Sequence, residues 1–172
     1  MVLDGECTLT GSDDARPDQP VTTGHKASLD TDAGIFRVRT TESSCRRLHI
    51  CGRWAAGCTT FGTFEPAGRT PPRQKGDPFD YPKTNDIDRH FHDCDEYWFV
   101  YEGRGIAVSE GRHYGVGPGD CVATGMGHHH DFPISHEPVK AVYFETELEG
   151  QKRGGHLWEY RHGPAEPVLE RQ

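Results

Sequence analysis

The stretch RHFHDCDEYWFVYEG, residues 89–103, places two histidines and a glutamate in front of an apolar run. His90 and His92 stand two residues apart, and in a strand such side chains point to the same face. At roughly 3.3 Å per residue, a straight strand would put the backbone of Glu96 about 13 Å from that of His92. One metal ion, with bonds of about 2 Å, would not reach all three side chains. We therefore predict that residues 93–95 turn the chain, and aspartates at both ends suit such a turn.

Short stretches with alternating apolar and polar residues lie on both sides of this segment, separated by turn residues, many of them glycines. Such stretches predict strands. They cover residues 34–40, 46–51, 58–65, 90–92, 96–103, 105–111, 112–120, 121–125, 128–132 and 139–146. No long stretch has the periodicity of a helix. Many short strands joined by glycine-rich turns predict an all-β sandwich or barrel.

The chain of 172 residues is long enough for one domain with a core and too short for two of ordinary size. We expect a polar N-terminal arm over residues 1–30, the barrel over 31–148 and a C-terminal extension over 149–172. Residues 66–88 form a long proline-rich segment, and loops of that length in a small domain are usually functional. We predict that 66–88 or 149–160 covers the end of the barrel that carries the histidines.

The acidic composition argues against several classes of partner. The formal net charge is −8 and the basic residues are scattered, so no basic stripe is present to displace counterions from a nucleic acid. No stretch approaches the roughly 20 apolar residues of a membrane helix, and the N-terminus does not resemble a signal peptide. We therefore expect a cytoplasmic protein that binds neither nucleic acid nor membrane, with its six cysteines as thiols.

A third histidine would complete a set of metal ligands. The segment GDCVATGMGHHH, residues 119–130, supplies three candidates, His128, His129 and His130. Because a strand points only alternate side chains inward, spacing alone leaves the choice among them open.

The first histidine cluster resembles the first motif of the cupin superfamily, which has the form G-x5-H-x-H-x3,4-E-x6-G. His90, His92, Glu96 and Gly103 stand at the matching positions. The leading glycine of the motif is replaced here by Thr84.

The second histidine cluster is similar to the second cupin motif, G-x5-P-x-G-x2-H-x3-N. Gly119, Gly127 and His130 match it in register, whereas Gly125 replaces the proline and Ile134 replaces the asparagine. These replacements affect turn geometry more than metal binding. The register of this motif selects His130 from the three neighbouring histidines.

The resemblance covers about residues 34–145 and implies a cupin jelly-roll β-barrel, also called a double-stranded β-helix. It implies that His90, His92, Glu96 and His130 bind one divalent metal ion inside the barrel. It also implies a homodimer, since cupins often dimerise through their sheets.

The donor set is compatible with Fe2+, Zn2+, Mn2+, Ni2+ or Cu2+, and we place Fe2+ first. The protein is then a metal-dependent enzyme acting on a small molecule, and we favour a dioxygenase that uses Fe(II) and O2. One alternative is a non-redox isomerase, cyclase or lyase, similar to sugar isomerases or polyketide cyclases. Another is a cupin that binds a metal or a ligand without catalysis.

Five further residues are candidates for contact with the substrate or for proton transfer. Besides Glu96, the carboxylate of Glu145 and the hydroxyl of Tyr143 share one face of a predicted strand and could act as acid or base. Trp98 follows Glu96 on the inward face, Arg89 precedes the histidines, and His156 lies in the C-terminal extension. We assign these last three to a substrate pocket, and the aromatic Trp98 favours an apolar or aromatic substrate.

Overall fold

The computed structural model describes residues 1–11, 18–27, 36–40, 44–52, 58–66, 76–146 and 155–167. The chain divides into two compact units, Met1–Gly52 and Arg53–Gln172. The described residues are almost entirely strands and connecting loops, with the one short helix α1 (Glu159–His162) near the C-terminus. No helix among the described residues is long and apolar enough to cross a membrane.

The first unit contains two small antiparallel sheets. One pairs β1 (Val2–Asp4) with β5 (Arg46–Arg47). In the other, β2 (Glu6–Gly11) lies between β3 (Gln19–Thr22) and β4 (Phe36–Thr40).

Three of these strands lie within residues 1–30, where the sequence predicts a polar arm, and the unit ends at Gly52 rather than at residue 30. The strands are held by a small cluster of buried side chains, Val2, Cys7 and Val21. Among the described residues, only three buried side chains hold these strands, and many polar residues separate them. The hydrophobic pattern is therefore weak, which explains why the sequence does not predict the strands.

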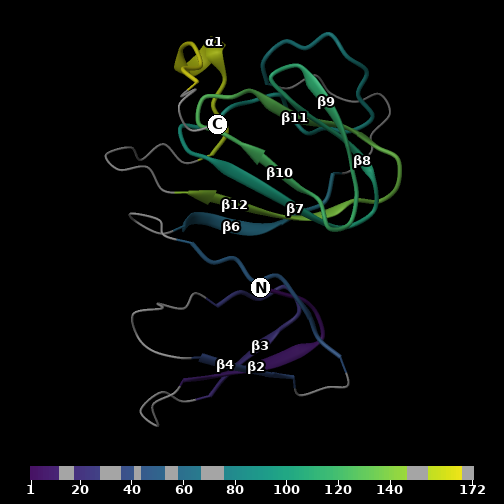
Figure 1. Ribbon diagram of the computed structural model, residues 1–172. Coiled ribbons are helices and arrows are strands. Elements are labelled where there is room, and N and C mark those ends of the chain that lie inside the picture. Colours follow the sequence, from purple (N-terminus) through teal and green to yellow (C-terminus); the bar gives the residue numbers. More distant parts are fainter. Residues whose placement is uncertain are drawn as a thin grey trace. The chain divides into compact units, whose positions relative to one another are not determined.

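The second unit consists of two antiparallel sheets that share one core (Figure 1). Their orders are β10-β7-β12-β6 and β11-β8-β9. Both sheets contribute to the core, for instance Val100 from one and Phe132 from the other. The strands are β6 (Cys58–Phe64), β7 (Glu96–Glu102), β8 (Gly105–Ser109), β9 (Arg112–Val116), β10 (Cys121–Thr124), β11 (His130–Ser135) and β12 (Lys140–Thr146). The all-β jelly roll expected from the sequence is confirmed.

Strand β7 sets the inward face on which the candidate site is built. Burial alternates along it, so that Glu96, Trp98 and Val100 point into the unit. Strand β12 is its direct neighbour, with Glu145 opposite Glu96 and Tyr143 opposite Trp98. Since opposite residues of an antiparallel pair share a face, Tyr143 and Glu145 also belong to the inward face.

The second histidine strand begins later than the alternation of the sequence suggests. The sequence predicts a strand over residues 128–132, whereas β11 starts at His130 and runs to Ser135. A turn precedes it, in which the amide of His128 donates to the carbonyl of Gly125. The turn keeps His128 out of the strand.

Two glycines of the matched motifs occupy positions that a larger residue would not fit. Gly103 has a φ of 75° and Gly127 a φ of 74°, a left-handed conformation that disfavours other residues. A Cβ on Gly103 would collide with the carbonyl of Pro138, and one on Gly127 would collide with that of Glu166. The motif glycines are therefore required by backbone conformation and by close approach of a second segment.

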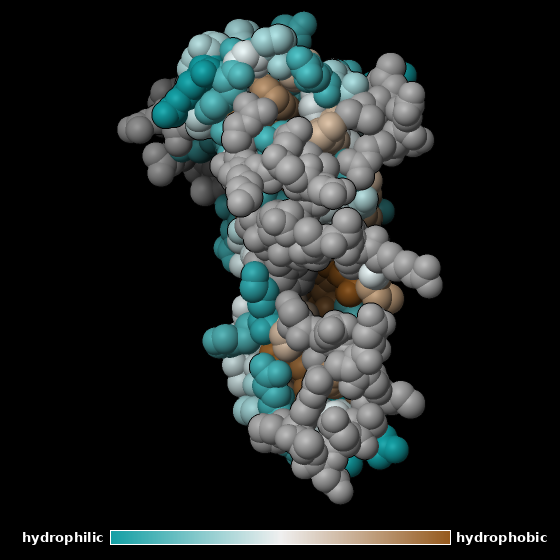
Figure 2. Space-filling view, turned by 90° about the vertical axis from the view of Figure 1, so that its left-hand side faces the viewer, coloured by the Kyte–Doolittle hydropathy of each residue, from teal (hydrophilic) through white to brown (hydrophobic). Residues whose placement is uncertain are grey.

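On the face shown in Figure 2, the described residues are mostly hydrophilic, with small hydrophobic areas between them. This agrees with the low hydrophobic share of the sequence, 33%.

Candidate metal centre

The first histidine segment lies beside the second through a backbone pairing outside the named strands. His90 and His130 form an antiparallel bridge, in which each amide donates to the carbonyl of the other, at 3.2 and 2.9 Å. His92 is tied to the same region because its carbonyl accepts a hydrogen bond from the amide of Gly127 at 2.8 Å. The two histidine clusters of the sequence are thus brought together by main-chain hydrogen bonds.

The chain bends at residues 93 and 94 before β7 begins at Glu96. The bend is held by Asp95, whose carboxylate accepts a hydrogen bond from the amide of Met126 at 3.0 Å. The amide of Asp95 in turn donates to the hydroxyl of Thr146 at 3.2 Å. This reversal is what allows Glu96 to face the two histidines that precede it.

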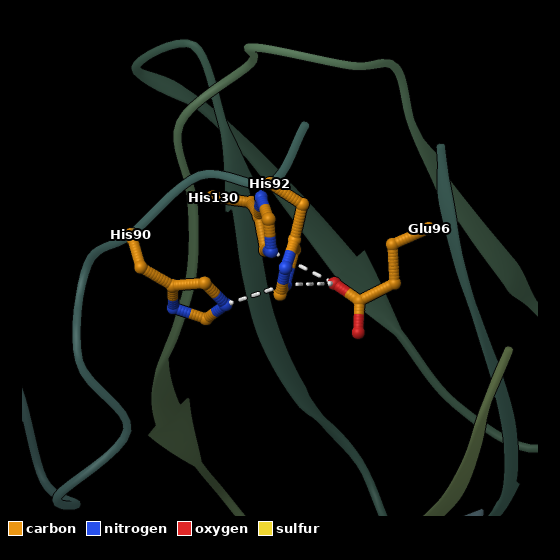
Figure 3. Close-up of side chains that lie close together, drawn as sticks. All are labelled: His90, His92, Glu96 and His130. Atoms are coloured by element: carbon orange, nitrogen blue, oxygen red, sulfur yellow. Dashed lines mark hydrogen bonds and ion pairs between the residues drawn. The ribbon is translucent and has the colours of Figure 1, made fainter. Parts of the chain in front are cut away.

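The four side chains predicted as metal ligands, His90, His92, Glu96 and His130, converge inside the second unit (Figure 3). One donor atom from each lies within 4.8 Å of the others. Nε2 of His90 lies 3.1 Å from Nε2 of His92. Oε2 of Glu96 lies 2.8 Å from Nε2 of His130 and 3.4 Å from Nε2 of His92. Neighbouring donors around one ion with bonds of about 2.1 Å are about 3.0 to 3.4 Å apart. Two of these separations fall in that range, and the third, 2.8 Å, is slightly shorter.

Each of the three histidines uses its Nδ1 atom for a backbone carbonyl. Nδ1 of His90 donates to the carbonyl of Asp88 at 2.8 Å, and Nδ1 of His130 to that of His128 at 3.0 Å. Nδ1 of His92 donates to the carbonyl of Gly155 at 3.0 Å. In a neutral imidazole the other nitrogen is then an acceptor. This arrangement fixes the tautomer that presents Nε2 to a metal.

The result is a group of acceptor atoms that face one another in a buried place. All four side chains are buried, and Oε2 of Glu96 and Nε2 of His130 face each other at 2.8 Å, with no other hydrogen-bond partner for either atom among the described residues. Acceptors held 2.8 to 3.4 Å apart repel one another unless a cation lies among them. The residues therefore fit a divalent metal ion, for which imidazole and carboxylate are common ligands.

The electrostatics of the cluster follow from burial and from the pairing of opposite charges. Burial raises the pKa of Glu96, but His130 and His92 outweigh it and hold that pKa well below its usual range. Burial and the neighbouring histidines lower the pKa of His90. Burial lowers the pKa of His92 as well, yet Glu96 raises it by more, so that the net shift is upward. The paired charges of Glu96 and the histidines therefore favour the ionised carboxylate, and Glu96 favours the protonated form of His92.

The other two neighbouring histidines point to different partners. Nε2 of His129 lies 3.0 Å from the buried carboxylate of Asp77. Nδ1 of His128 lies 3.9 Å from the carboxylate of Glu110. Both side chains are buried, so burial alone would not have selected His130.

Two candidate site residues lie on the inward face of β12, and one of them, Glu145, is next to the cluster. Glu145 is buried, and its carboxylate, a ring nitrogen of His92 and the sulfur of Cys94 lie within 4.8 Å of one another. Tyr143 is half-buried against the core and lies against Gly62, where a Cβ would be 2.9 Å from its hydroxyl.

The remaining candidates divide between the core, a loop and the C-terminal segment. The Trp98 side chain is buried in the core, and its ring lies 5.3 Å from that of His130. The Arg89 guanidinium donates to the carbonyl of Pro78 at 3.1 Å and so points to the loop before the histidines. His156 stacks on His90, with ring centroids 3.7 Å apart.

The segment Gly155–Trp158 lies along the first histidine segment, although it is far from it in sequence. Leu157 pairs with Phe91 through two backbone hydrogen bonds of 3.1 and 3.0 Å. The carboxylate of Asp88 accepts one hydrogen bond from His156 at 2.8 Å and another from Trp158 at 2.6 Å. Sequence reasoning missed Asp88, although its position two residues before His90 is a usable signal for a side chain near the ligands.

The fold, the two motifs and the convergence of four side chains agree with the resemblance to the cupin superfamily seen in the sequence. No family model matches the chain. It is 43% identical over 171 residues to the uncharacterized protein y4oW of Sinorhizobium fredii, covering 99% of this chain and 78% of that protein, and the two share a family.

Two solved structures are more distantly similar. A cupin protein from Bacteroides fragilis is 17% identical, with 55% of this chain and 70% of that chain covered and a TM-score of 0.36. The DMSP lyase DddQ from Ruegeria pomeroyi is 22% identical, with 58% of this chain and 43% of that chain covered and a TM-score of 0.37. Likenesses of this size carry no argument about family or function.

Proposed function

We propose that the protein is a metal-dependent enzyme that acts on a small molecule at the cluster of His90, His92, Glu96 and His130. The observation that carries this proposal is the set of buried ring nitrogens and carboxylate oxygens facing one another, in which Oε2 of Glu96 and Nε2 of His130 have no partner among the described residues apart from each other. A protein without a metal would have little reason to bury such a group, because unsatisfied acceptors destabilise the fold.

Three neutral imidazoles and one carboxylate leave a divalent ion with a net positive charge. Fe2+, Zn2+, Mn2+, Ni2+ and Cu2+ all accept this donor set. When bound, such an ion would polarise a carbonyl or hydroxyl group of a ligand or lower the pKa of water to about 7.

The chemistry that the surroundings favour is proton transfer without a change of oxidation state, as in an isomerase, cyclase or lyase. Glu145 brings a second carboxylate to the inward face, directly opposite Glu96 on the neighbouring strand. His156 brings an imidazole held by the carboxylate of Asp88. Carboxylates and imidazoles beside a metal site are the usual acids and bases of such enzymes.

The second candidate is the dioxygenase that uses Fe(II) and O2. The support for this candidate is that an ion held by four protein ligands could also bind a substrate and O2. Trp98, which the sequence assigns to the substrate pocket, is buried in the core with its ring 5.3 Å from that of His130. A binding protein without catalysis is the third candidate.

The first experiment is elemental analysis of untagged protein purified without a chelator. We expect about one equivalent of a divalent metal, and its loss in His130→Ala. His136→Ala is the matched control, because His136 is an exposed histidine outside the cluster. A wild-type protein without metal affinity, or a His130→Ala variant that keeps its metal, would contradict the proposal.

The second experiment separates the two chemistries. The metal-loaded protein is incubated with a library of small hydroxylated and carboxylated metabolites, with and without O2, and products are identified by mass spectrometry. Turnover in anaerobic buffer with Zn2+ supports the non-redox enzyme. Turnover that requires both Fe2+ and O2 supports the dioxygenase, and a metal-loaded protein that binds small molecules but converts none supports the third candidate.

A further inference from the structure

Two cysteines of the first unit are in contact with each other as free thiols. Cys7 is 3% exposed and belongs to the buried cluster of Val2, Cys7 and Val21. Cys45 is half-buried and packs against that cluster. The two side chains share a hydrogen bond. Because the two residues are far apart in the chain, the fold itself brings the thiols together.

We propose that Cys7 and Cys45 form a redox site, at which a small disulfide compound such as oxidised glutathione converts the two thiols into an intramolecular disulfide bond. This inference goes beyond the proposed function and is independent of it. The candidate metal ligands all lie in the second unit, whereas both cysteines lie in the first.

Paired strands hold both cysteines in place. Cys7 lies in β2, the central strand of its sheet, between β3 and β4. Cys45 directly precedes β5, in which Arg46 pairs with Asp4 of β1. Gly5 alone separates β1 from β2 in the chain, so both thiols are positioned by the same short stretch. Groups held in contact in this way react with each other far more readily than with a second molecule.

The first unit has little hydrophobic core to stabilise it. Its described residues form one small buried cluster, with Leu9, Ala27 and Cys45 packed against it. Domains with so small a core commonly depend on disulfide bonds. A bond between Cys7 and Cys45 would close a loop of about 38 residues and so reduce the conformational entropy of the unfolded chain. The first unit would therefore be more stable in the oxidised state than in the reduced state.

The different exposure of the two thiols sets the order of the reaction. The sulfur of half-buried Cys45 attacks one sulfur of oxidised glutathione, breaks its S–S bond and releases one glutathione thiol. The sulfur of Cys7 then attacks Sγ of Cys45 and releases the second glutathione thiol. Each protein thiol gives its proton to one departing glutathione, so that one disulfide is consumed and one is formed.

The buried thiol is suited to the second step. Burial raises the pKa of Cys7, and the neighbouring Cys45 raises it further. A thiol with a raised pKa is rarely ionised and reacts slowly with a molecule in solution. The contact with Cys45 offsets this in the second step, because the sulfur that Cys7 attacks is already beside it.

The experiment incubates the full-length protein with mixtures of reduced and oxidised glutathione. The reaction is stopped with acid, the protein is unfolded in iodoacetamide, and linked peptides are identified by mass spectrometry. We expect a Cys7–Cys45 linkage that forms while reduced glutathione is still in excess. Cys51 is an exposed thiol of the same unit and should form at most a mixed disulfide with glutathione. Linkage of Cys7 or Cys45 to Cys51 instead would overturn the proposal, as would Cys7 and Cys45 that remain thiols in oxidised glutathione alone.

Variants test the order of the reaction, while the wild-type peptide map stands without them. In Cys7→Ser the reaction should stop at a mixed disulfide on Cys45. In Cys45→Ser, Cys7 should react with glutathione at least about tenfold more slowly than Cys45 does in the wild type. Cys51→Ser is the matched control and should form the Cys7–Cys45 bond unchanged. A Cys7 that reacts as fast as Cys45 would overturn the assigned order.

Hydrogen exchange tests the consequence for stability. The amides of β2 should exchange at least about tenfold more slowly in the oxidised wild type than in the reduced wild type, because the bond restricts opening of the unit. Cys45→Ser should show the same exchange in both buffers. Equal exchange of oxidised and reduced wild type would overturn the stabilising role of the bond.

Discussion

At the scale of single residues, the site depends on which nitrogen of each histidine carries the proton. Three backbone carbonyls, those of Asp88, His128 and Gly155, bind the Nδ1 atoms of the three histidines. These carbonyls come from three separate parts of the chain. The backbone conformation at all three residues therefore sets which nitrogen of each histidine faces the metal site, whether or not the side chains of those three residues contact it.

Glu96→Gln tests the charge of the cluster. A neutral amide keeps the shape of the side chain but removes the only carboxylate of the four ligands, so we expect a loss of metal affinity of about 100-fold or more. Thermal denaturation with and without Zn2+ measures this, because a metal that binds only the folded state raises the melting temperature. Glu102→Gln on the same strand is the control, since Glu102 pairs with Lys140 at the surface. Equal Zn2+ stabilisation of both variants would refute the assignment.

The pH dependence of metal binding follows from the raised pKa of His92. Its imidazolium form persists above the ordinary histidine pKa of 6.5, and a proton on Nε2 excludes the metal. Affinity should therefore be constant at high pH and fall as the pH decreases through the raised pKa of His92. Zn2+ titrations between about pH 8 and about pH 5 measure this. An affinity that stays flat across this range would contradict the assignment of His92 as a ligand.

Spacing in the sequence predicted which residue types would form the site, and it could not predict the residues that support them. His90, His92 and Glu96 lie within one short stretch, so strand geometry relates them directly. His156 was a candidate from the sequence, but the carbonyl of Gly155 was not, and the pairing of Leu157 with Phe91 is what brings it to His92. A pairing between segments so far apart in the chain cannot be predicted from a local sequence pattern.

At the scale of elements, the inward face of the second unit depends on β7 and on the turn that joins it to β8. Alternation of burial along β7 could be predicted from its sequence because the strand is long and half of its side chains enter the core. Strand β5 illustrates the opposite case. The strand predicted over residues 46–51 is confined to Arg46–Arg47, since both residues are exposed and little burial supports a longer pairing.

Gly103→Ala tests the turn between β7 and β8. The substitution combines a left-handed conformation with a collision against the carbonyl of Pro138, so we expect a loss of unfolding free energy of about 3 kcal/mol. Gly111→Ala is the control. Gly111 has a φ of 72° but nothing within 4 Å of the added Cβ, and its cost should be about 1 kcal/mol. Urea denaturation compares the two, and equal losses would mean that the close approach of Pro138 does not matter.

At the scale of the whole molecule, every residue of the metal site and of its support lies in the unit Arg53–Gln172. The sequence placed the barrel between residues 31 and 148, whereas the structure begins this unit at Arg53 and includes the C-terminal segment in it. The difference arises because contacts, and not composition, decide to which unit a polar segment belongs.

A fragment of residues 53–172 should therefore keep the metal site. We expect it to bind Co2+ with the same stoichiometry and visible spectrum as the full-length protein, because the four ligands and their backbone partners are all present. Circular dichroism first shows whether the fragment is folded. A folded fragment that does not bind Co2+ would show that residues 1–52 contribute to the site.

Because His90 and His130 are paired, a metal bound to both would slow unfolding of the protein as well as take part in its chemistry. An ion held by both residues would join two segments forty positions apart in the chain, and breaking that joint would precede the separation of the two sheets. Unfolding of the loaded protein should therefore be slow, and a chelator should shorten its lifetime in a protease long before it changes the folded structure. In a cell, the supply of the metal would then set the abundance of the protein.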